Sequence, residues 1–205
     1  MAKRMKILGV TLAGGQSSRM GGGDKCLLEI GGIPLLSHVI TRLRPQVDAM
    51  ILNANGDSSR FAAFELPVVA DSITGFAGPL AGVLAGMDYA AEHGFDAIVT
   101  VAADTPFFPD TLVSALTQAR ETAGTPLAMA MTPDPQRGLS RHTTFGLWSV
   151  NLREDLRAAI NAGTSKVVAW TEPHGCAKAV FPTDPIDPFF NVNTPEDLKT
   201  AEGMI

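Results

Sequence analysis

The sequence has few cysteines, no long apolar run and no excess of positive charge. Its two cysteines in 205 residues, Cys26 and Cys176, are too few for a disulfide framework and lack metal-site spacing. No apolar stretch approaches the length that crosses a bilayer, and the basic start at Lys3, Arg4 and Lys6 precedes a strand-like segment rather than a signal-peptide core. The net charge is −5, which argues against nucleic-acid binding. We therefore expect a cytoplasmic protein without a nucleic-acid or membrane partner, whose anionic ligands are held by local cations.

Three signatures of nucleotide or covalent chemistry are also missing. Lys25 is followed by Cys26, so the chain has no Walker loop, and no G-x-G-x-x-G opens a helix, which excludes a dinucleotide-binding oxidoreductase. The four histidines are scattered, and no Ser–His–Asp set can be argued from their spacing. A direct attack by a bound acceptor, rather than a covalent enzyme intermediate, is the economical mechanism for such a chain.

A glycine-rich stretch from Leu12 to Lys25 follows the apolar run Ile7–Leu12, which predicts a buried strand. Five glycines within ten residues can turn successive backbone N–H groups toward one anion. Arg19 and Lys25 add cationic side chains to the same loop. The pattern favours a polyphosphate cradle over the alternative of a flexible linker, because linkers rarely follow a buried strand directly.

Strand-like and helix-like segments alternate through the first two thirds, which predicts one α/β domain with a mostly parallel sheet. The predicted strands are 7–12, 49–52, 68–70, 97–102, 127–131, 144–150 and 177–181. The predicted helices are 35–43, 58–64, 78–91, 109–122, 152–160 and one capped by Thr194 with Pro195 in its first turn. Residues 132–142 are predicted to be a Pro-rich, charged loop.

Three polar residues fall at predicted strand ends: Asn53, Asp71 and Asp104. Ligands of open parallel sheets bind outside the carboxyl ends of the strands, which is also where the glycine-rich loop leaves the first strand. Beside a triphosphate, Asp104 is suited to Mg²⁺; alone, it could equally cap the turn before Pro106. Asp71 could reach a ribose or base edge or turn the chain, and Asn53 could read a base edge or belong to a turn.

The glycine-rich stretch resembles the L-A-G-G-x-S-x-R-M-G-x-x-K signature of the nucleotidyltransferase superfamily. The whole chain resembles the molybdenum cofactor guanylyltransferases. The match includes Asp71 followed by the G-P-L-A-G of residues 78–82, the D-T-P of 104–106 and the N-V-N-T-P-E-D-L of 191–198. The resemblance implies a Rossmann-like three-layer α/β/α fold of the nucleotide-diphospho-sugar-transferase type. It also implies one domain with a nucleotide-binding part at about 6–125 and an acceptor-binding part at about 126–200.

By this resemblance, the chain joins GMP from GTP to molybdopterin, with or without molybdenum, and releases pyrophosphate with Mg²⁺ as cofactor. Other cofactor-biosynthesis proteins and apo-molybdoenzymes are implied as partners. The residues implied for the nucleotide are Leu12, Ala13, Gly14, Gly15, Lys25, Asn53, Asp71 and Asp104. Arg19, Lys25 and Asp104 are implied as catalytic, Asp104 as the metal ligand, and Gly82, Asn191 and Asn193 as acceptor-binding.

Nucleotide choice depends on Gly14, where the related cytidylyltransferases typically have alanine. A missing Cβ leaves room for a purine, which favours GTP. The chain departs from the family at Arg141-His142-Thr143, where His-Pro is expected. The alternatives are a CTP-dependent molybdopterin cytidylyltransferase, another small nucleotidyltransferase, or a nucleotide-binding regulatory module without catalysis. Retention of Arg19, Lys25 and Asp104 speaks against the last.

Overall fold

A computed structural model describes residues 4–14, 24–73, 75 and 78–205 of the chain. Within that part, seven strands form one sheet and two short strands form a separate hairpin. The sheet strands are β1 (Ile7–Leu12), β4 (Ala49–Asn53), β5 (Val68–Val69), β6 (Ala97–Ala102), β7 (Leu127–Asp134), β8 (Gly138–Ser149) and β9 (Cys176–Val180). The hairpin strands are β2 (Glu29–Ile30) and β3 (Ile33–Pro34).

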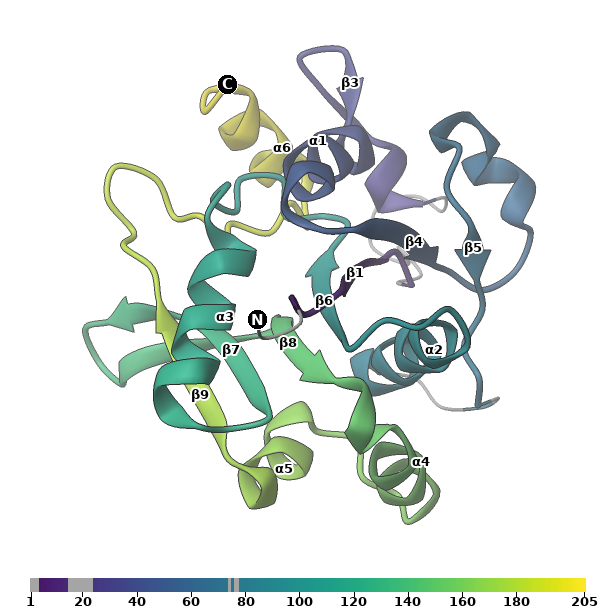
Figure 1. Cartoon of the computed structure of the whole chain (residues 1–205). Helices are drawn as coiled ribbons and strands as arrows, with labels where there is room; N and C mark the ends of the chain where they lie inside the picture. Colours follow the sequence, from purple (N-terminus) through teal and green to yellow (C-terminus); the bar gives the residue numbers. More distant parts are fainter. Residues whose placement is uncertain (1–3, 15–23, 74, 76–77) are drawn as a thin grey trace.

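The sheet has the order β5-β4-β1-β6-β8-β7-β9. Strands β5, β4, β1 and β6 run parallel, as do β7 and β9, whereas β8 is antiparallel to both of its neighbours. Figure 1 shows β4 and β5 on one flank of the molecule and the β7–β8–β9 group on the other. The carboxyl ends of β1, β4 and β6 therefore meet at one edge, in the middle of the fold.

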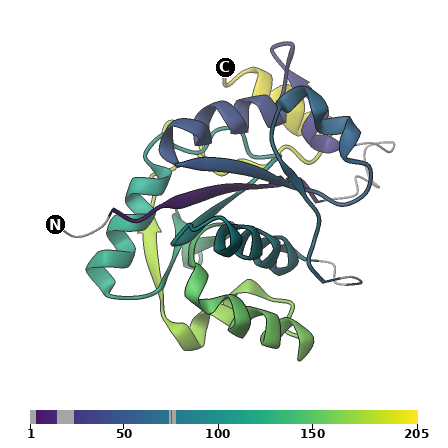
Figure 2. The same ribbon diagram turned by 45° about the vertical axis from the view of Figure 1, so that its right-hand side comes forward.

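Helices cover both faces of the sheet (Figure 2). The α-helices are α1 (Leu35–Leu43), α2 (Pro79–Glu92), α3 (Leu112–Ala123), α4 (Arg153–Asn161), α5 (Val167–Thr171) and α6 (Pro195–Glu202). The 3-10 helices are 25–27, 44–46, 58–64, 150–152 and 172–174. Helices α1 and α3 pack on one face, and α2, α4 and α5 on the other. This is the three-layer α/β/α arrangement that the sequence predicted.

Two apolar layers hold the sheet between the helices. Strand alternation sends Leu8 and Val10 toward α2, while the neighbouring positions of β1 face α1. Trp148 is fully buried between α5 and the sheet, and its indole N–H donates to Thr100 Oγ1 at 2.8 Å. A third cluster around Ile30 and Val192 anchors α6 beside the β2–β3 hairpin. No helix in the described ranges is long and apolar enough to cross a membrane.

Most predicted elements are confirmed, with shifts of one to three residues at their ends, except that the strand predicted at 144–150 begins six residues earlier, at Gly138. The strands predicted at 7–12 and 97–102 and the helix at 35–43 have the predicted bounds. The helix predicted at 58–64 is a 3-10 helix. Thr194 caps α6 through a complete capping box, as predicted. The short helix α5 and the β2–β3 hairpin were not predicted.

The prediction of a loop at 132–142 is wrong, because these residues form the outer half of the β7–β8 hairpin. The turn is made by Asp134, whose carboxylate accepts from the N–H groups of Gln136 at 2.8 Å and Arg137 at 2.9 Å. Gly138 then takes a φ of 76°, which suits glycine. The exposed polar side chains of this hairpin give it the composition of a loop, although its backbone is paired.

Candidate active site

The candidate site lies where β1, β4 and β6 end. The N–H of Ala13 donates to the carbonyl of Asn53 at 2.9 Å, and the N–H of Ala103 donates to the carbonyl of Leu12 at 3.1 Å. Backbone hydrogen bonds therefore connect the carboxyl ends of the three strands. The glycine-rich loop begins directly from this fastened edge.

Lys25 lies at the other end of that loop, in the first position of a 3-10 helix, and contacts Asp104 beyond β6. Its Nζ is 3.3 Å from Asp104 Oδ2 and also donates to Asn193 Oδ1. The side chains of Lys25 and Asp104 are 19% and 27% exposed, so the pair is accessible from solvent. An ammonium has three donors, so two fixed contacts leave one N–H free for an oxygen of a ligand.

The segment before α6 is bound to the same centre. Thr105 Oγ1 donates to Asn191 Oδ1, and the N–H of Val192 donates to the carbonyl of Asp104 at 2.9 Å. The N–H of Asn193 donates to the Asp197 carboxylate of the capping box at 2.9 Å, and this contact lowers the pKa of Asp197. The cap of α6 therefore fixes the backbone from which the Asn193 side chain reaches Lys25.

A second polar group lies on the β4–β5 flank of the same edge. Asn53, which is 4% exposed, donates from Nδ2 to Asp71 Oδ1 at 3.0 Å and to the carbonyl of Val69 at 3.1 Å. Asn55 donates to Asp71 Oδ2 at 2.7 Å and accepts from the N–H of Asp71 at 2.9 Å. The Asp71 carboxylate is thus held in a fixed orientation beside a buried amide, which is a suitable surface for reading hydroxyl and base edges.

A network behind Asp71 fastens the following residue to α2. Ser72 Oγ donates to Asp88 Oδ2 at 2.6 Å, and Arg157 Nη2 of α4 lies 2.5 Å from Asp88 Oδ1. Arg153 is 3.6 Å from the same oxygen. This network connects the segment after Asp71 to α2 through Asp88, and through Asp88 to α4.

The two glycines singled out from the sequence have different surroundings. A Cβ at Gly82 would collide with the Asn53 amide and the Leu12 side chain, so α2 can approach β4 only with glycine there. A Cβ on Gly14 would meet no atom within 4 Å. The fold therefore requires Gly82 for its packing, whereas Gly14 faces open space.

Cys26 is a packing residue of the hydrophobic core. It is 4% exposed, and burial raises the pKa of its thiol to about 12, with the Asp24 carboxylate adding to the shift. A thiol with this pKa has almost no thiolate at neutral pH and is a poor nucleophile. Arg60 pairs with Asp24 at 3.1 Å, which places a further cation near the start of the 3-10 helix.

The structure brings most of the predicted site residues together in two linked groups. One group contains Lys25, Asp104 and Asn193, with Asn191 joined through Thr105; the other contains Asn53 and Asp71, with Gly82 packed beneath. Leu12, Ala13 and Gly14 lie between them at the end of β1. Gly15 and Arg19 lie outside the described residues. Sequence reasoning missed Thr105 and Asn55 as supporting residues, because a single hydroxyl or amide next to a turn carries no distinctive pattern.

Asp104 is the one residue predicted to bind metal, and the surrounding groups are compatible with Mg²⁺. Within the described ranges, no group of three or more His, Cys, Asp or Glu residues could hold a metal by itself. Magnesium usually takes one or two protein carboxylates and completes its octahedron with phosphate oxygens and water. A single accessible carboxylate beside the Lys25 ammonium fits that requirement.

Comparisons with known proteins show the family of the chain. The sequence matches the MobA-like NTP transferase domain family over residues 9–176. It is 50% identical over 201 residues to a molybdenum cofactor guanylyltransferase of Bradyrhizobium sp. (strain ORS 278), covering 97% of this chain and 92% of that protein. It is 48% identical to one of Nitrobacter hamburgensis, covering 96% and 93%. The crystal structure of molybdopterin-guanine dinucleotide biosynthesis protein A from Archaeoglobus fulgidus superposes with a TM-score of 0.71 at 23% identity, covering 97% of each chain.

The fold, the fastened strand ends and the family match define an enzyme of the nucleotidyltransferase class. Among these enzymes, the chain belongs to the molybdenum cofactor guanylyltransferase family.

Proposed function

We propose that the chain transfers GMP from GTP to molybdopterin, giving molybdopterin guanine dinucleotide and pyrophosphate. The observation that carries this proposal is the Lys25–Asp104 ion pair at the centre of the sheet edge, flanked by the Asn53–Asp71 pair. One group is suited to a polyphosphate with its metal, and the other to a nucleoside. The names of the relatives supply the acceptor.

Different residues bind the triphosphate, the guanosine and the acceptor. Leu12, Ala13, Gly14 and Gly15 hold the triphosphate with Lys25, and Asn53 and Asp71 contact the guanosine. Gly82 keeps Asn53 in place from below, and Asn191 and Asn193 lie at the acceptor side of the phosphates. In this proposal, residues of about 6–125 serve mainly the nucleotide and those of about 126–200 the acceptor.

The reaction is an in-line displacement at the α-phosphorus. A phosphate oxygen of the acceptor forms the new P–O bond, and the bond to the bridging oxygen breaks as pyrophosphate leaves with the electron pair. A phosphate monoester has its second pKa near ~6, so it is largely dianionic at neutral pH and needs no general base. Lys25 and Arg19 stabilise the charge that develops on the phosphate oxygens. Asp104 would hold Mg²⁺, which neutralises charge on the triphosphate when it is bound.

The open space at Gly14 supports guanine over cytosine. The described residues place no atom within 4 Å of a Cβ at this position, so an incoming ligand can use the space on their side. A purine is larger than a pyrimidine and needs the closer backbone approach that glycine allows.

The test incubates the purified protein with Mg²⁺, molybdopterin and one of GTP, CTP, ATP or UTP, and measures pyrophosphate and dinucleotide. GTP should give both products in equal amounts. Preference for CTP would make the chain a cytidylyltransferase, and nucleotide binding without pyrophosphate release in the presence of acceptor would make it a regulatory module.

A further inference from the structure

A concave surface on the β7–β8–β9 flank is not used by the residues discussed so far. The paired positions Met131, Arg141 and Val180 share one face of the sheet, as does Lys178 through its pairing with Met129. This is the face that α5 and α4 cover further along the strands, through Trp170 against Trp148. Beyond those helices the face is open, and a hollow of about 570 Å³ lies on it.

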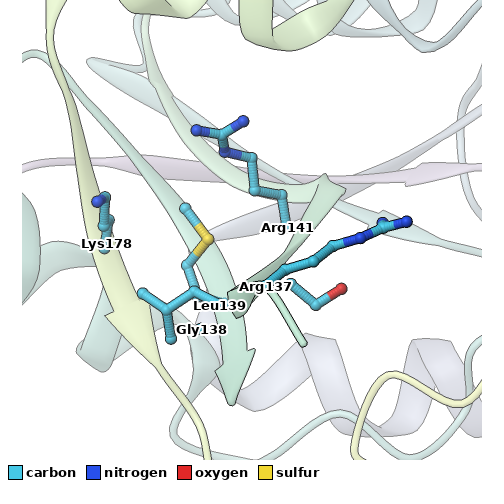
Figure 3. A pocket seen from close by; sticks show the side chains of 7 residues that line it. Arg137, Gly138, Leu139, Arg141 and Lys178 are labelled. Atoms are coloured by element: carbon cyan, nitrogen blue, oxygen red, sulfur yellow. The ribbon is translucent and has the colours of Figure 1, made fainter. Parts of the chain in front are cut away.

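The hollow is lined by cations and by apolar side chains. Arg137, Arg141 and Lys178 line it together with the apolar side chains of Met131 and Leu139. Figure 3 shows Lys178 of β9 on one side, and Arg141 of β8 and Arg137 of the β7–β8 turn on the other. Among the described residues, no carboxylate lines the hollow.

The charges of Arg141 and Lys178 are not neutralised by the described part of the chain. Neither side chain makes an ion pair or hydrogen bond with a described residue. Arg137 is partly compensated, since its charge helps to lower the pKa of the Asp134 carboxyl at the hairpin turn. Arg141 lies along the same face near Cys176, and its charge opposes the rise in the pKa of that thiol caused by burial. Two uncompensated cations facing one hollow are unusual in a protein of net charge −5.

The chemistry of this surface restricts what it can bind. A volume of several hundred cubic ångströms is typical of small-molecule sites. Arg and Lys side chains bind anionic groups, and a methionine thioether with a leucine favours the face of a flat ring. The ligand class is therefore a flat heterocycle that carries negative charge.

The hollow also lies on the correct flank for the acceptor. In the strand order, β4 and β5 with the nucleoside-reading pair lie on one side of β1, and β6, β8 and β7 follow on the other. Arg141 lies on β8, one strand spacing of about 4.8 Å from β6, whose end carries Asp104, and Lys178 lies on β9, three spacings from β6. A ligand whose phosphate is at Asp104 would therefore meet Arg141 before Lys178.

We propose that the hollow binds the part of the acceptor beyond its reacting phosphate, with Arg141 and Lys178 holding its other anionic groups and Met131 and Leu139 contacting the flat pterin ring. This inference rests on the proposed guanylyl transfer, because that reaction fixes the acceptor's phosphate near Asp104. It assigns acceptor binding to three strands that have no direct contact with GTP.

The experiment compares wild type with the Arg141→Glu/Lys178→Glu double variant, using Arg44→Glu, at an exposed position directly after α1, as a control for charge reversal elsewhere on the surface. Binding of molybdopterin without GTP is followed by pterin fluorescence, and binding of GTP with Mg²⁺ by calorimetry. Arg141 and Lys178 are exposed, so glutamate at these two strand positions should not disturb the fold. Circular dichroism of each variant checks this. The double variant should bind molybdopterin about 10–100-fold more weakly, with GTP affinity within about twofold of wild type, and Arg44→Glu should change neither.

The outcomes separate this inference from the proposed function. Unchanged molybdopterin binding in the double variant would overturn the inference, even if dinucleotide were still formed. Loss of GTP binding instead would make the hollow a nucleotide site and overturn it as well. If wild type bound molybdopterin through these cations but formed no dinucleotide, the hollow would remain an acceptor site and the transfer reaction would be wrong.

Discussion

Asn193→Ala tests whether the segment before α6 acts on the nucleotide through Lys25. The substitution removes the amide oxygen that accepts from Lys25 Nζ and leaves the 3.3 Å contact with Asp104 as the remaining side-chain partner in the described part of the chain. Immobilising a free lysine side chain costs up to about 2 kcal/mol of rotamer entropy. With one of two partners retained, we expect a loss of about 1 kcal/mol in GTP binding, or roughly fivefold in Kd.

The measurement is a calorimetric titration with GTP and Mg²⁺ in the absence of acceptor. Lys25→Ala should weaken binding by about 2–3 kcal/mol, the range for a lost contact to a charged group. Adding Asn193→Ala to Lys25→Ala should then have no further effect, since the amide would have no ammonium to position. If Asn193→Ala left GTP affinity unchanged and raised only the KM for molybdopterin, Asn193 would act on the acceptor alone, and the inference that it positions Lys25 for the nucleotide would be refuted.

Three further substitutions test other parts of the account. Asp104→Ala should lower kcat at least 1,000-fold, about 4 kcal/mol, with the circular dichroism spectrum unchanged. The control is Asp110→Ala, which breaks an exposed 3.5 Å ion pair with Arg42. Near-normal turnover in Asp104→Ala would contradict the assignment of Asp104 as the metal ligand. Gly14→Ala should leave the melting temperature unchanged, because the added Cβ meets no described atom within 4 Å. The substitution should weaken the binding of GTP more than the binding of CTP. Equal effects on both nucleotides would argue against purine selection at this position. Burial lowers the pKa of His142, and the Asp187 carboxylate partly offsets this shift. The His142 imidazole therefore binds a proton more readily in the unfolded chain, so the free energy of unfolding should fall as pH drops through and below about 6.5. A His142→Gln variant with the same pH dependence of unfolding would contradict this role of His142.

The sequence predicted the sheet edge well because strong local signals converge there. The apolar runs ending at Leu12, Asn53 and Ala102 define three buried strands, and a parallel sheet brings their ends together. Proximity of Asn53 to Asp71 follows from the same rule. The roles of the individual side chains do not, because a turn residue and a ligand residue can have the same neighbours in sequence.

The features that were missed depend on contacts between distant residues. The β7–β8 hairpin has a polar tip that is typical of a loop, and its pairing is set by the neighbouring strand rather than by its own composition. The link from Asn193 to Lys25 joins residues 168 positions apart. The cationic hollow brings together residues of β7, β9, and β8 with the turn before it. Strands β7 and β9 become neighbours only when the sheet forms. No local pattern can encode such neighbours.

The most direct measurement is the product analysis of wild-type protein with molybdopterin, Mg²⁺ and each of the four nucleoside triphosphates. The account predicts that GTP gives one pyrophosphate and one molybdopterin guanine dinucleotide per turnover, and that CTP, ATP and UTP give little. A faster reaction with CTP would contradict the assignment of guanylyl transfer. Absence of pyrophosphate with all four, despite nucleotide binding, would contradict catalysis itself.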